Sequence, residues 1–331
     1  MLYVSFHGGK PGDDGVDPIN QVWAYDKDGK VVSKAVLQGL PPGASELRGL
    51  TLDPAGALYV VVGYKDDSEV LAFTAPDKGS ASYTGLFVSF TGASYPVHPF
   101  AIAFGPAATF VSCQDSNVVL ALGPPGSRHA GQPLASPPAL GAYTPLLAGT
   151  FVASADGNLP GVPKTAAVAE PLGLAVKIVD AAPDAKQKQK VQNSVRDVAV
   201  VDSQLIVADE AGNAVKLYDL ATGGLAQALT DKNLRSPVHL LPSGKDLYIA
   251  SKGTDMILRA TLSDGVLGKP KVVTDKLKEP AGLAIGGDHL IAASRDKKHK
   301  GLYTMPLGTD HVTPTLLVAT SDYPEFVLHT K

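Results

Sequence analysis

Short apolar stretches recur along the chain and are separated by turn-forming residues. A unit opens with a short apolar stretch, often beginning at proline, such as Pro237-Val238-His239-Leu240. A second stretch such as Leu247-Tyr248-Ile249 follows, and an alternating one such as Val215-Lys216-Leu217-Tyr218 comes third. Apolar and alternating runs bounded by Gly, Asn and Asp predict strands joined by tight hairpins. We therefore predict an all-β chain built from one repeated unit.

The repeat distinguishes a closed ring from other all-β folds. Five regular copies begin with the stretches Leu47–Leu50, Pro99–Ile102, Val195–Val198, Pro237–Leu240 and Pro280–Leu283. A β-sandwich is the alternative, but a sandwich lacks a unit repeated along the sequence. A further copy is split between the termini, with its first strand at Tyr323–His329 and its second at Met1–His7. We predict a single β-propeller domain over residues 1–331, closed by a blade made of residues 324–331 and 1–44.

The number of blades depends on the course of residues 120–193. The interval between the equivalent residues Ala101 and Asp197 is about twice the other intervals. Within it, residues 149–158 match residues 108–117, which supply the second strand of a regular copy. We favour seven four-stranded blades, one of them degenerate. Six blades with a long insertion at about 120–193 is the alternative.

Composition limits the partners of the chain. The formal net charge is −3, and charged residues make up 18% of the 331 residues. The Lys-rich stretches 186–190 and 295–300 lack the interleaved aromatic residues of a nucleic-acid channel, so we expect no nucleic-acid partner. No apolar run is long enough to span a membrane. No phosphate-binding glycine loop is present, so we expect no nucleotide cofactor.

Neither the cysteine content nor the start of the chain identifies the cellular compartment of the protein. The single cysteine, Cys113, excludes an internal disulfide and a cysteine-based metal cluster. We expect no targeting segment, because strand sequence begins at residue 2. A removed leader would leave the same pattern, so a secreted origin stays open.

The repeat resembles a known superfamily in its clearest copies. Glu279-Pro280-Ala281-Gly282-Leu283, and Leu205-Ile206-Val207-Ala208-Asp209 followed by Val215-Lys216-Leu217-Tyr218-Asp219, are similar to NHL-repeat propellers. They also resemble the wider group of gluconolactonase-like, virginiamycin B lyase and YVTN-like β-propellers. The resemblance covers most of the chain except about 120–193. It implies the fold but no single function, because relatives include metal-dependent lactonases, lyases and protein-binding modules.

The resemblance also implies where a site lies. In such propellers the start of each first strand and the end of each second strand open on one face of the central channel. Several positions there carry charge where other blades have Gly or an apolar residue. The ligand-binding candidates are Arg48, Phe100, Arg196, Lys252, Arg295 and Tyr323, and the acid–base candidates are His7, Arg196, His239 and Glu325. Buried unpaired charges are costly, so either a polar ligand pocket or structural ion pairs, such as Arg196 with Asp209, explain them.

A divalent metal is a further candidate. His98, His239, Glu46, Asp209 and Glu210 map to the same face, and imidazole and carboxylate groups can hold Zn²⁺, with carboxylates also suiting Ca²⁺ or Mg²⁺. Lactonases of the resembled group use carboxylates and Asn around a central metal, and Asn193 and Asp197 lie near one such position without completing that set. Histidines that only form hydrogen bonds are the alternative.

The sequence thus predicts a polar central pocket that binds a small polar or anionic molecule. If the protein is an enzyme, metal-assisted hydrolysis of the lactonase kind or lyase chemistry is the expected class. The alternative is a non-catalytic scaffold that binds a protein or glycan on the same face. A scaffold should expose an apolar or aromatic patch there, whereas an enzyme should gather ionisable groups in a concavity.

Overall fold

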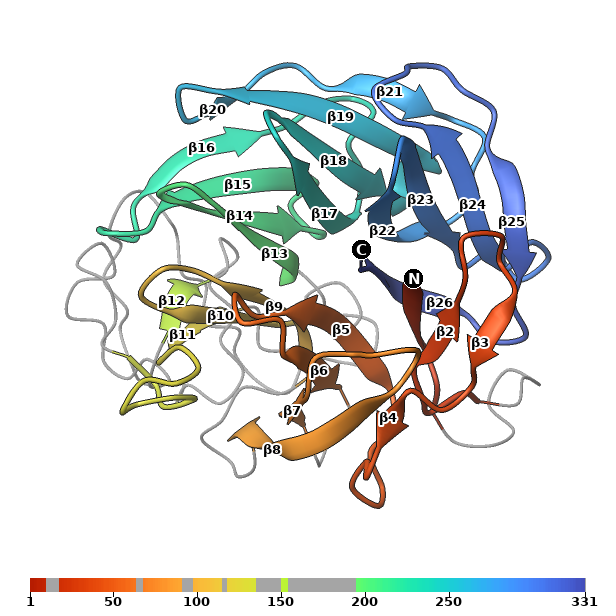
Figure 1. Cartoon of the computed structure of the whole chain (residues 1–331). Helices are drawn as coiled ribbons and strands as arrows, with labels where there is room; N and C mark the ends of the chain where they lie inside the picture. Colours follow the sequence, from red (N-terminus) through yellow and green to blue (C-terminus); the bar gives the residue numbers. More distant parts are fainter. Residues whose placement is uncertain are drawn as a thin grey trace, which may run out of the picture.

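The computed structural model describes residues 1–9, 18–63, 68–90, 98–114, 118–134, 150–153 and 195–330. These residues form six antiparallel sheets arranged as the blades of a β-propeller (Figure 1). The helical structure within them is one 3₁₀ turn, Lys252–Thr254. None of the described helices could cross a membrane.

Each blade runs outward from the channel through four strand positions. The innermost strands, in ring order, are β26 (Pro324–His329), β5 (Leu47–Leu52), β9 (Pro99–Phe104), β13 (Val195–Val201), β17 (Pro237–Ser243) and β22 (Pro280–Gly286). The second strands are β1 (Leu2–Phe6), β6 (Leu58–Val62), β10 (Thr109–Cys113), β14 (Gln204–Asp209), β18 (Asp246–Ser251) and β23 (His289–Ser294). We number the blades 1 to 6 in this order.

The third and outer strands complete the blades. The third strands are β2 (Trp23–Tyr25), β7 (Glu69–Phe73), β11 (Val118–Leu122), β15 (Ala214–Asp219), β19 (Met256–Ser263) and β24 (Gly301–Pro306). The outer strands are β3 (Val31–Ser33), β8 (Ala81–Ser89), β12 (Thr150–Ala153), β16 (Leu225–Leu229), the pair β20 (Val266–Leu267) and β21 (Lys271–Thr274), and β25 (Thr315–Ala319). A short strand, β4 (Leu37–Gln38), leaves blade 1 and pairs in parallel with β8 of blade 2.

Blade 1 is built from both ends of the chain, as predicted. β1 lies between β26 and β2, with Leu2 opposite His329 and Val4 opposite Val327. Outside the strands, the amino group of Met1 donates to the carbonyl of Thr330 at 2.7 Å. The N and C marks lie close together beside this blade in Figure 1. The ring is therefore closed by strand pairing between the two termini.

The predicted count of seven blades is not confirmed, and the structure has the six-blade alternative. The inner strand of blade 3, β9, packs directly against that of blade 4, β13. The repeat predicts residues 150–153 as the second strand of a degenerate blade, but they pair with β11 as the outer strand of blade 3. A short apolar run looks the same in sequence whether it forms a second strand or an outer strand. The repeat alone therefore predicts the wrong strand position for residues 150–153. Residues 135–149 and 154–194 of the predicted insertion lie outside the described residues.

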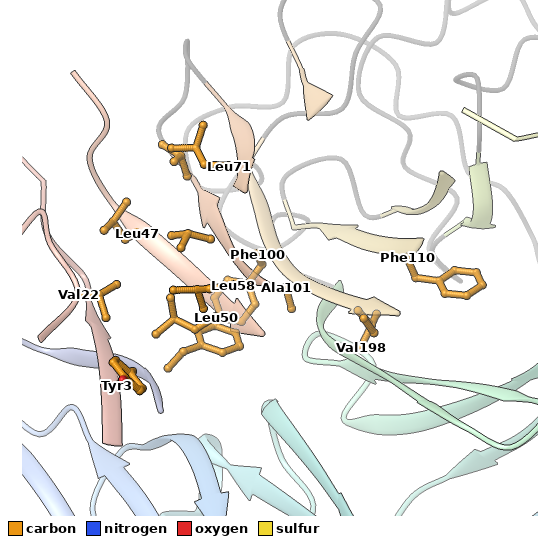
Figure 2. Packing of buried hydrophobic residues seen from close by; sticks show 14 of the residues in the cluster. Tyr3, Val22, Leu47, Leu50, Leu58, Leu71, Phe100, Ala101, Phe110 and Val198 are labelled. Carbon is orange, nitrogen blue, oxygen red and sulfur yellow. The ribbon is translucent and has the colours of Figure 1, made fainter. Parts of the chain in front are cut away.

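Apolar side chains fill the spaces between neighbouring blades. Figure 2 shows one such cluster, in which buried residues of four successive blades follow one another from Tyr3 through Leu50 and Phe100 to Val198. The inner strands approach closely in places. A Cβ atom on Gly282 of β22 would lie 2.7 Å from the Phe326 Cα atom of β26. Glycine is therefore required at this contact between blades 6 and 1.

Candidate functional site

The end of the channel where the inner strands begin is held together by one repeated hydrogen bond. In each case, the residue after a second strand donates its backbone N–H to the carbonyl of the residue before the inner strand of the same blade. The pairs are His7 to Tyr323 (2.8 Å), Gly63 to Glu46 (3.0 Å), Gln114 to His98 (2.9 Å), Lys252 to Ser236 (3.1 Å) and Arg295 to Glu279 (3.0 Å). We call these ten residues the mouth. The sequence map assigned both members of each pair to one face, and the structure brings them into contact.

Four mouth residues adopt a backbone conformation that favours glycine. Glu46, His98, Ser236 and Glu279 have φ between 42° and 61°. A left-handed residue with a Cβ atom costs roughly 1–2 kcal/mol, and such residues persist where the surrounding structure imposes them. Here the carbonyl hydrogen bond of each blade holds the turn. The mouth therefore presents its side chains from backbone positions that recur in successive blades.

Glu325 is the centre of a charged cluster that joins blades 6, 1 and 2. Its carboxylate lies 3.0 Å from Nη1 of Arg295 and 3.5 Å from Nδ1 of His7. Nη2 of Arg295 also lies 3.2 Å from Nδ1 of His7. The nearly buried Arg48 donates to the carbonyl of His7 at 2.8 Å and to the carboxylate of Glu46 at 2.7 Å. The cluster brings predicted candidates from both chain ends into contact.

The charges in this cluster are mutually dependent. Burial alone would raise the pKa of Glu325, but Arg295, the hydrogen bond with His7, and Arg48 together hold that pKa well below its usual range. Burial lowers the pKa of Arg48, while Glu325 and Glu46 oppose that effect. Glu325 therefore remains ionised and compensates buried positive charge near the channel.

A second cluster joins blades 3 and 4. Arg196 forms an ion pair with Glu210 through Nε and donates through Nη1 to the side-chain oxygen of Gln114. The side-chain nitrogen of Gln114 lies 2.8 Å from Nδ1 of His98. The guanidinium carbon of Arg196 also lies 4.8 Å from the centre of the Phe100 ring, where the ring quadrupole attracts a cation. These contacts therefore hold the Arg196 guanidinium over the Phe100 ring.

The third cluster is a buried histidine–aspartate pair between blades 4 and 5. Nδ1 of His239 lies 2.6 Å from Oδ2 of Asp197. These residues occupy equivalent positions of adjacent inner strands, where blades 2 and 6 carry Gly49 and Gly282. The His239 ring meets the Phe326 ring edge to face, with centres 4.7 Å apart. Sequence mapping placed His239 on the channel but did not pair it with Asp197.

The mouth leads into a narrow polar pocket. Its lining includes the side chains of Arg196, Lys252, Arg295, Glu325 and His239. As the side chains stand, it has a volume of about 10 Å³, which suits roughly one water molecule. A wider cavity of about 400 Å³ lies at the opposite end of the channel and is lined mostly by apolar residues of the inner strands. His239 and Phe326 line both spaces.

The proposed metal ligands are not gathered at one point. Glu46 contacts Arg48, Glu210 contacts Arg196, His98 contacts Gln114 and His239 contacts Asp197. In the described ranges, no group of three or more His, Cys, Asp or Glu side chains could hold a metal ion. The residues placed by the structure therefore do not fit a metal centre. Asn193 lies outside the described residues.

One predicted ion pair is wrong, and the structure explains why. Arg196 pairs with Glu210 and not with Asp209. Asp209 is the last residue of β14 and lies 2.5 Å from Nζ of Lys216, on the neighbouring strand β15. Glu210 lies beyond the strand end and reaches the mouth instead. The Lys216 partner was missed, although a lysine flanked by apolar residues in Ala214–Tyr218 is itself a sequence signal of buried pairing.

The remaining predicted ligand residues line the same end of the channel. Tyr323 lies beneath two cations, with Nζ of Lys300 at 4.7 Å and the guanidinium carbon of Arg295 at 6.0 Å from its ring centre. Lys252 lines the pocket. Within the part of the chain that the structure describes, its ammonium group has no ion-pair partner. The mouth therefore offers a cation that no carboxylate of the described residues neutralises.

Comparison with known proteins supports the fold without assigning a function. No protein-family model matches the sequence, and no curated protein matches it. Among solved structures, a protein of Bacteroides fragilis described as a "putative 6-phosphogluconolactonase" is 12% identical, with a TM-score of 0.55 over 95% of this chain and 80% of that chain. A similarly described protein of Bacteroides uniformis is 13% identical, with a TM-score of 0.53 and the same coverage.

A third structural neighbour has a different context. The nidogen/laminin complex contains a chain that is 11% identical, with a TM-score of 0.57 over 98% of this chain and 96% of that chain. At these identities the similarity shows a shared β-propeller fold alone. The predicted resemblance to the lactonase-like and NHL-type propellers is thus confirmed for the fold.

Proposed function

We propose that the mouth binds a small molecule carrying a carboxylate or phosphate group, and that a lactone of such an acid is its substrate. The observation that carries the proposal is the set of unused positive donors at one pocket. Lys252 has no ion-pair partner among the described residues, and Nε of Arg295 is buried without an acceptor there. Arg196 lines the same pocket from the opposite blade pair. Buried donors without acceptors are costly unless a ligand satisfies them.

The pocket lining favours an anion over a cation. Among the described residues that line it, Arg196, Lys252 and Arg295 are cations and Glu325 is the one carboxylate. Charge-assisted hydrogen bonds from guanidinium and ammonium groups are the usual means of binding carboxylate and phosphate. The pocket as its side chains stand has room for about one water molecule, so we place such a head group at the mouth, against the cations that line the pocket.

The reaction class is suggested by the fold neighbours. Two of them are described as putative 6-phosphogluconolactonases, and a phosphorylated sugar lactone combines an anionic group with a cyclic ester. Hydrolysis of that ester needs a proton acceptor for water and positive charge near the carbonyl oxygen. The His239–Asp197 pair and the mouth cations offer these two properties. The proposed reaction is written with these side chains alone.

Binding is tested by calorimetric titration of the protein with inorganic phosphate and with 6-phosphogluconate. We expect Lys252→Ala to weaken binding about 10- to 100-fold, which is the usual effect of losing one charge-assisted hydrogen bond. Lys245→Ala is the matched control, because Lys245 is exposed and lies in the β17–β18 hairpin at the other end of the same blade. Affinity should fall as salt is added.

Two results would contradict the proposal. One is the absence of phosphate and 6-phosphogluconate binding, and the other is equal loss of affinity in Lys252→Ala and Lys245→Ala. Lactone hydrolysis is followed with 6-phosphogluconolactone after dialysis against a chelator. Activity that disappears with chelation and returns with Mg²⁺, Ca²⁺ or Zn²⁺ would instead support the metal-assisted reaction predicted from the sequence.

The scaffold alternative receives less support. A protein- or glycan-binding mouth should expose apolar or aromatic side chains. In the described ranges, the large hydrophobic residues that are exposed all lie on outer strands: Val31, Val32, Leu86, Leu225, Val266 and Leu316. Their position on the outer rim of the ring separates them from the mouth.

A further inference from the structure

The wide cavity at the end of the channel opposite the mouth, which we call the far cavity, has the size of a small-molecule site. Its volume is about 400 Å³, and sites of this kind typically measure roughly 300–1,000 Å³. His239 and Phe326 line both this cavity and the mouth pocket. Their rings meet edge to face, with centres 4.7 Å apart. These two side chains therefore mark the inner end of the far cavity.

Partly exposed apolar side chains surround the outer part of the far cavity. The inner strands begin at the mouth, so residues in their second halves lie towards the other end of the channel. Five inner strands each contribute one partly buried apolar residue of this kind to the lining: Leu52, Phe104, Val200, Leu241 and Leu328. Single exposed apolar residues are ordinary on a protein surface, but several that line one concavity indicate a ligand site. The lining therefore suits a ligand with an apolar body.

The charged groups of the far cavity differ from those at the mouth. Among the described residues that line it, Asp53 and Asp197 are carboxylates, His239 is a histidine and none is Lys or Arg. Asp197 is buried, and its two oxygens accept the backbone N–H groups of Val198 and Leu240 at 2.8 Å each. Because these bonds already satisfy Asp197, Asp53 is the carboxylate that can serve a ligand.

Asp53 lies directly after β5, at the outer end of the far cavity. Its Oδ1 accepts the backbone N–H groups of Ala55 and Ala57 at 2.9 Å each, which holds the carboxylate in the β5–β6 turn. Across the ranges that the structure describes, its Oδ2 has no hydrogen-bond partner and the side chain forms no ion pair. Gly49, which also lines the cavity, lies four residues earlier, or about 13 Å along an extended chain. A partly buried carboxylate is thus fixed at one end of a deep apolar space.

We propose that the far cavity binds a small apolar molecule that carries a positively charged amino group. The apolar body lies against the inner strands towards Phe326, and the amino group lies at the outer end beside Asp53. An amino group that is partly removed from water needs an acceptor, and a carboxylate is the strongest one. An anionic ligand would meet no Lys or Arg among the described lining residues. This site is separate from the mouth and does not depend on the proposed function.

The test is a titration followed by nuclear magnetic resonance of labelled isoleucine methyl groups. Ile102 lines the far cavity, and its signal is identified by its loss in Ile102→Val. The probes are 4-phenylbutylamine, 4-phenylbutanol and 4-phenylbutyrate, which share an apolar skeleton and are positive, neutral and negative at pH 7. We expect saturable shifts of the Ile102 signal, with affinity highest for the amine and lowest for the carboxylate. The signal of Ile206 is the control, because that residue is buried between blades and lines neither space.

An isosteric variant tests the role of the carboxylate. Asp53→Asn keeps the oxygen that holds the turn and removes the charge. It should weaken amine binding about three- to fivefold, the upper part of the range for a partly exposed ion pair, and leave alcohol binding unchanged. Asp202→Asn is the matched control, because Asp202 is exposed in the β13–β14 hairpin at the same end of the channel and does not line the far cavity.

A bulkier side chain tests the location. Leu241→Trp fills part of the far cavity and should abolish the Ile102 shifts with all three probes. Leu316→Trp is its control, because Leu316 is exposed on the outer strand β25. Thermal unfolding of each variant separates a lost fold from a filled cavity. Lys252→Ala should leave amine binding unchanged, since Lys252 lines the mouth pocket and not the far cavity.

Three results would overturn the proposal. An Ile102 signal that responds to none of the probes would show that the far cavity is only a solvent-filled end of the channel. Equal affinity for the amine and the carboxylate, or equal effects of Asp53→Asn and Asp202→Asn, would show that Asp53 does not select the charge of the ligand. Loss of amine binding in a folded Lys252→Ala variant would place the amine at the mouth instead.

Discussion

Arg295 and Glu325 face each other at 3.0 Å across the contact between blade 6 and blade 1. Arg295 follows the second strand of blade 6, whereas Glu325 lies on the inner strand that closes the ring. His7, from the other end of the chain, contacts both side chains. The contact that closes the ring is therefore also part of the charged mouth.

Replacement of this carboxylate should be costly. In Glu325→Gln, Arg295 loses its ion-pair partner, and the buried Arg48 loses one of the two carboxylates that compensate its charge. Breaking a buried ion pair from one side typically costs about 3–5 kcal/mol, and we expect a loss of unfolding free energy of that order in urea titrations. Glu279→Gln is the control, because Glu279 is an exposed mouth residue. An equal loss of unfolding free energy in the two variants would show that the charge of Glu325 does not stabilise the fold.

The same carboxylate predicts a pH dependence. The pKa of Glu325 in the folded protein lies well below its ordinary value of 4.5. The unfolded chain therefore binds a proton more readily, so ionised Glu325 stabilises the fold above the unfolded pKa. That contribution is lost as the pH falls through the folded pKa. The stability difference between wild type and Glu325→Gln should be full above about pH 5 and shrink as the pH is lowered further. A difference that grows on acidification would contradict this assignment.

The close approach of β22 and β26 predicts a strict requirement for glycine. In Gly282→Ala the new methyl group would lie 2.7 Å from backbone atoms of Glu325 and Phe326, and backbone cannot rotate away. Overpacking of this kind costs about 1–3 kcal/mol. In Gly268→Ala the nearest atom would be 3.5 Å away, so that variant is the control. Denaturant unfolding of both variants gives the comparison, and equal values would mean that blade 6 moves outward freely.

Deletion of the closing strand should affect stability and binding together. Removing residues 324–331 takes away β26, its pairing with β1, and the Glu325 carboxylate. We expect the melting temperature to fall by more than about 10 °C, with loss of phosphate binding. Removal of Lys331 alone is the control. A truncated protein that melts like the full chain would show that pairing between the termini does not close the ring.

Much of the fold could be predicted because the sequence repeats the same strand pattern in each blade. The split blade followed from the match between the C-terminal strand and the inner strands of other blades. The mouth residues followed from the same alignment, since one backbone hydrogen bond recurs in successive blades. The blade number did not follow, because the apolar run Thr150–Ala153 fits an outer strand as well as a second strand.

The pairing of side chains was less predictable than their location. Asp197 and His239 were both assigned to the channel, but a contact between adjacent inner strands depends on how closely blades 4 and 5 approach. Asp209 and Glu210 are adjacent in sequence and reach different partners, because one ends a strand and the other lies beyond it. Such differences of one residue are set by strand ends, which the repeat locates only approximately.

The repeated carbonyl hydrogen bond at the mouth makes it a set of exchangeable positions. Ser236 and Glu279 share one backbone conformation and one anchoring bond, although they carry different side chains. The anchor uses backbone atoms only, so a new side chain at these positions leaves the blade intact. Ligand preference could therefore be redesigned at positions such as Ser236 and Glu279, which lie outside the charged cluster around Glu325, without changing the backbone of the blades.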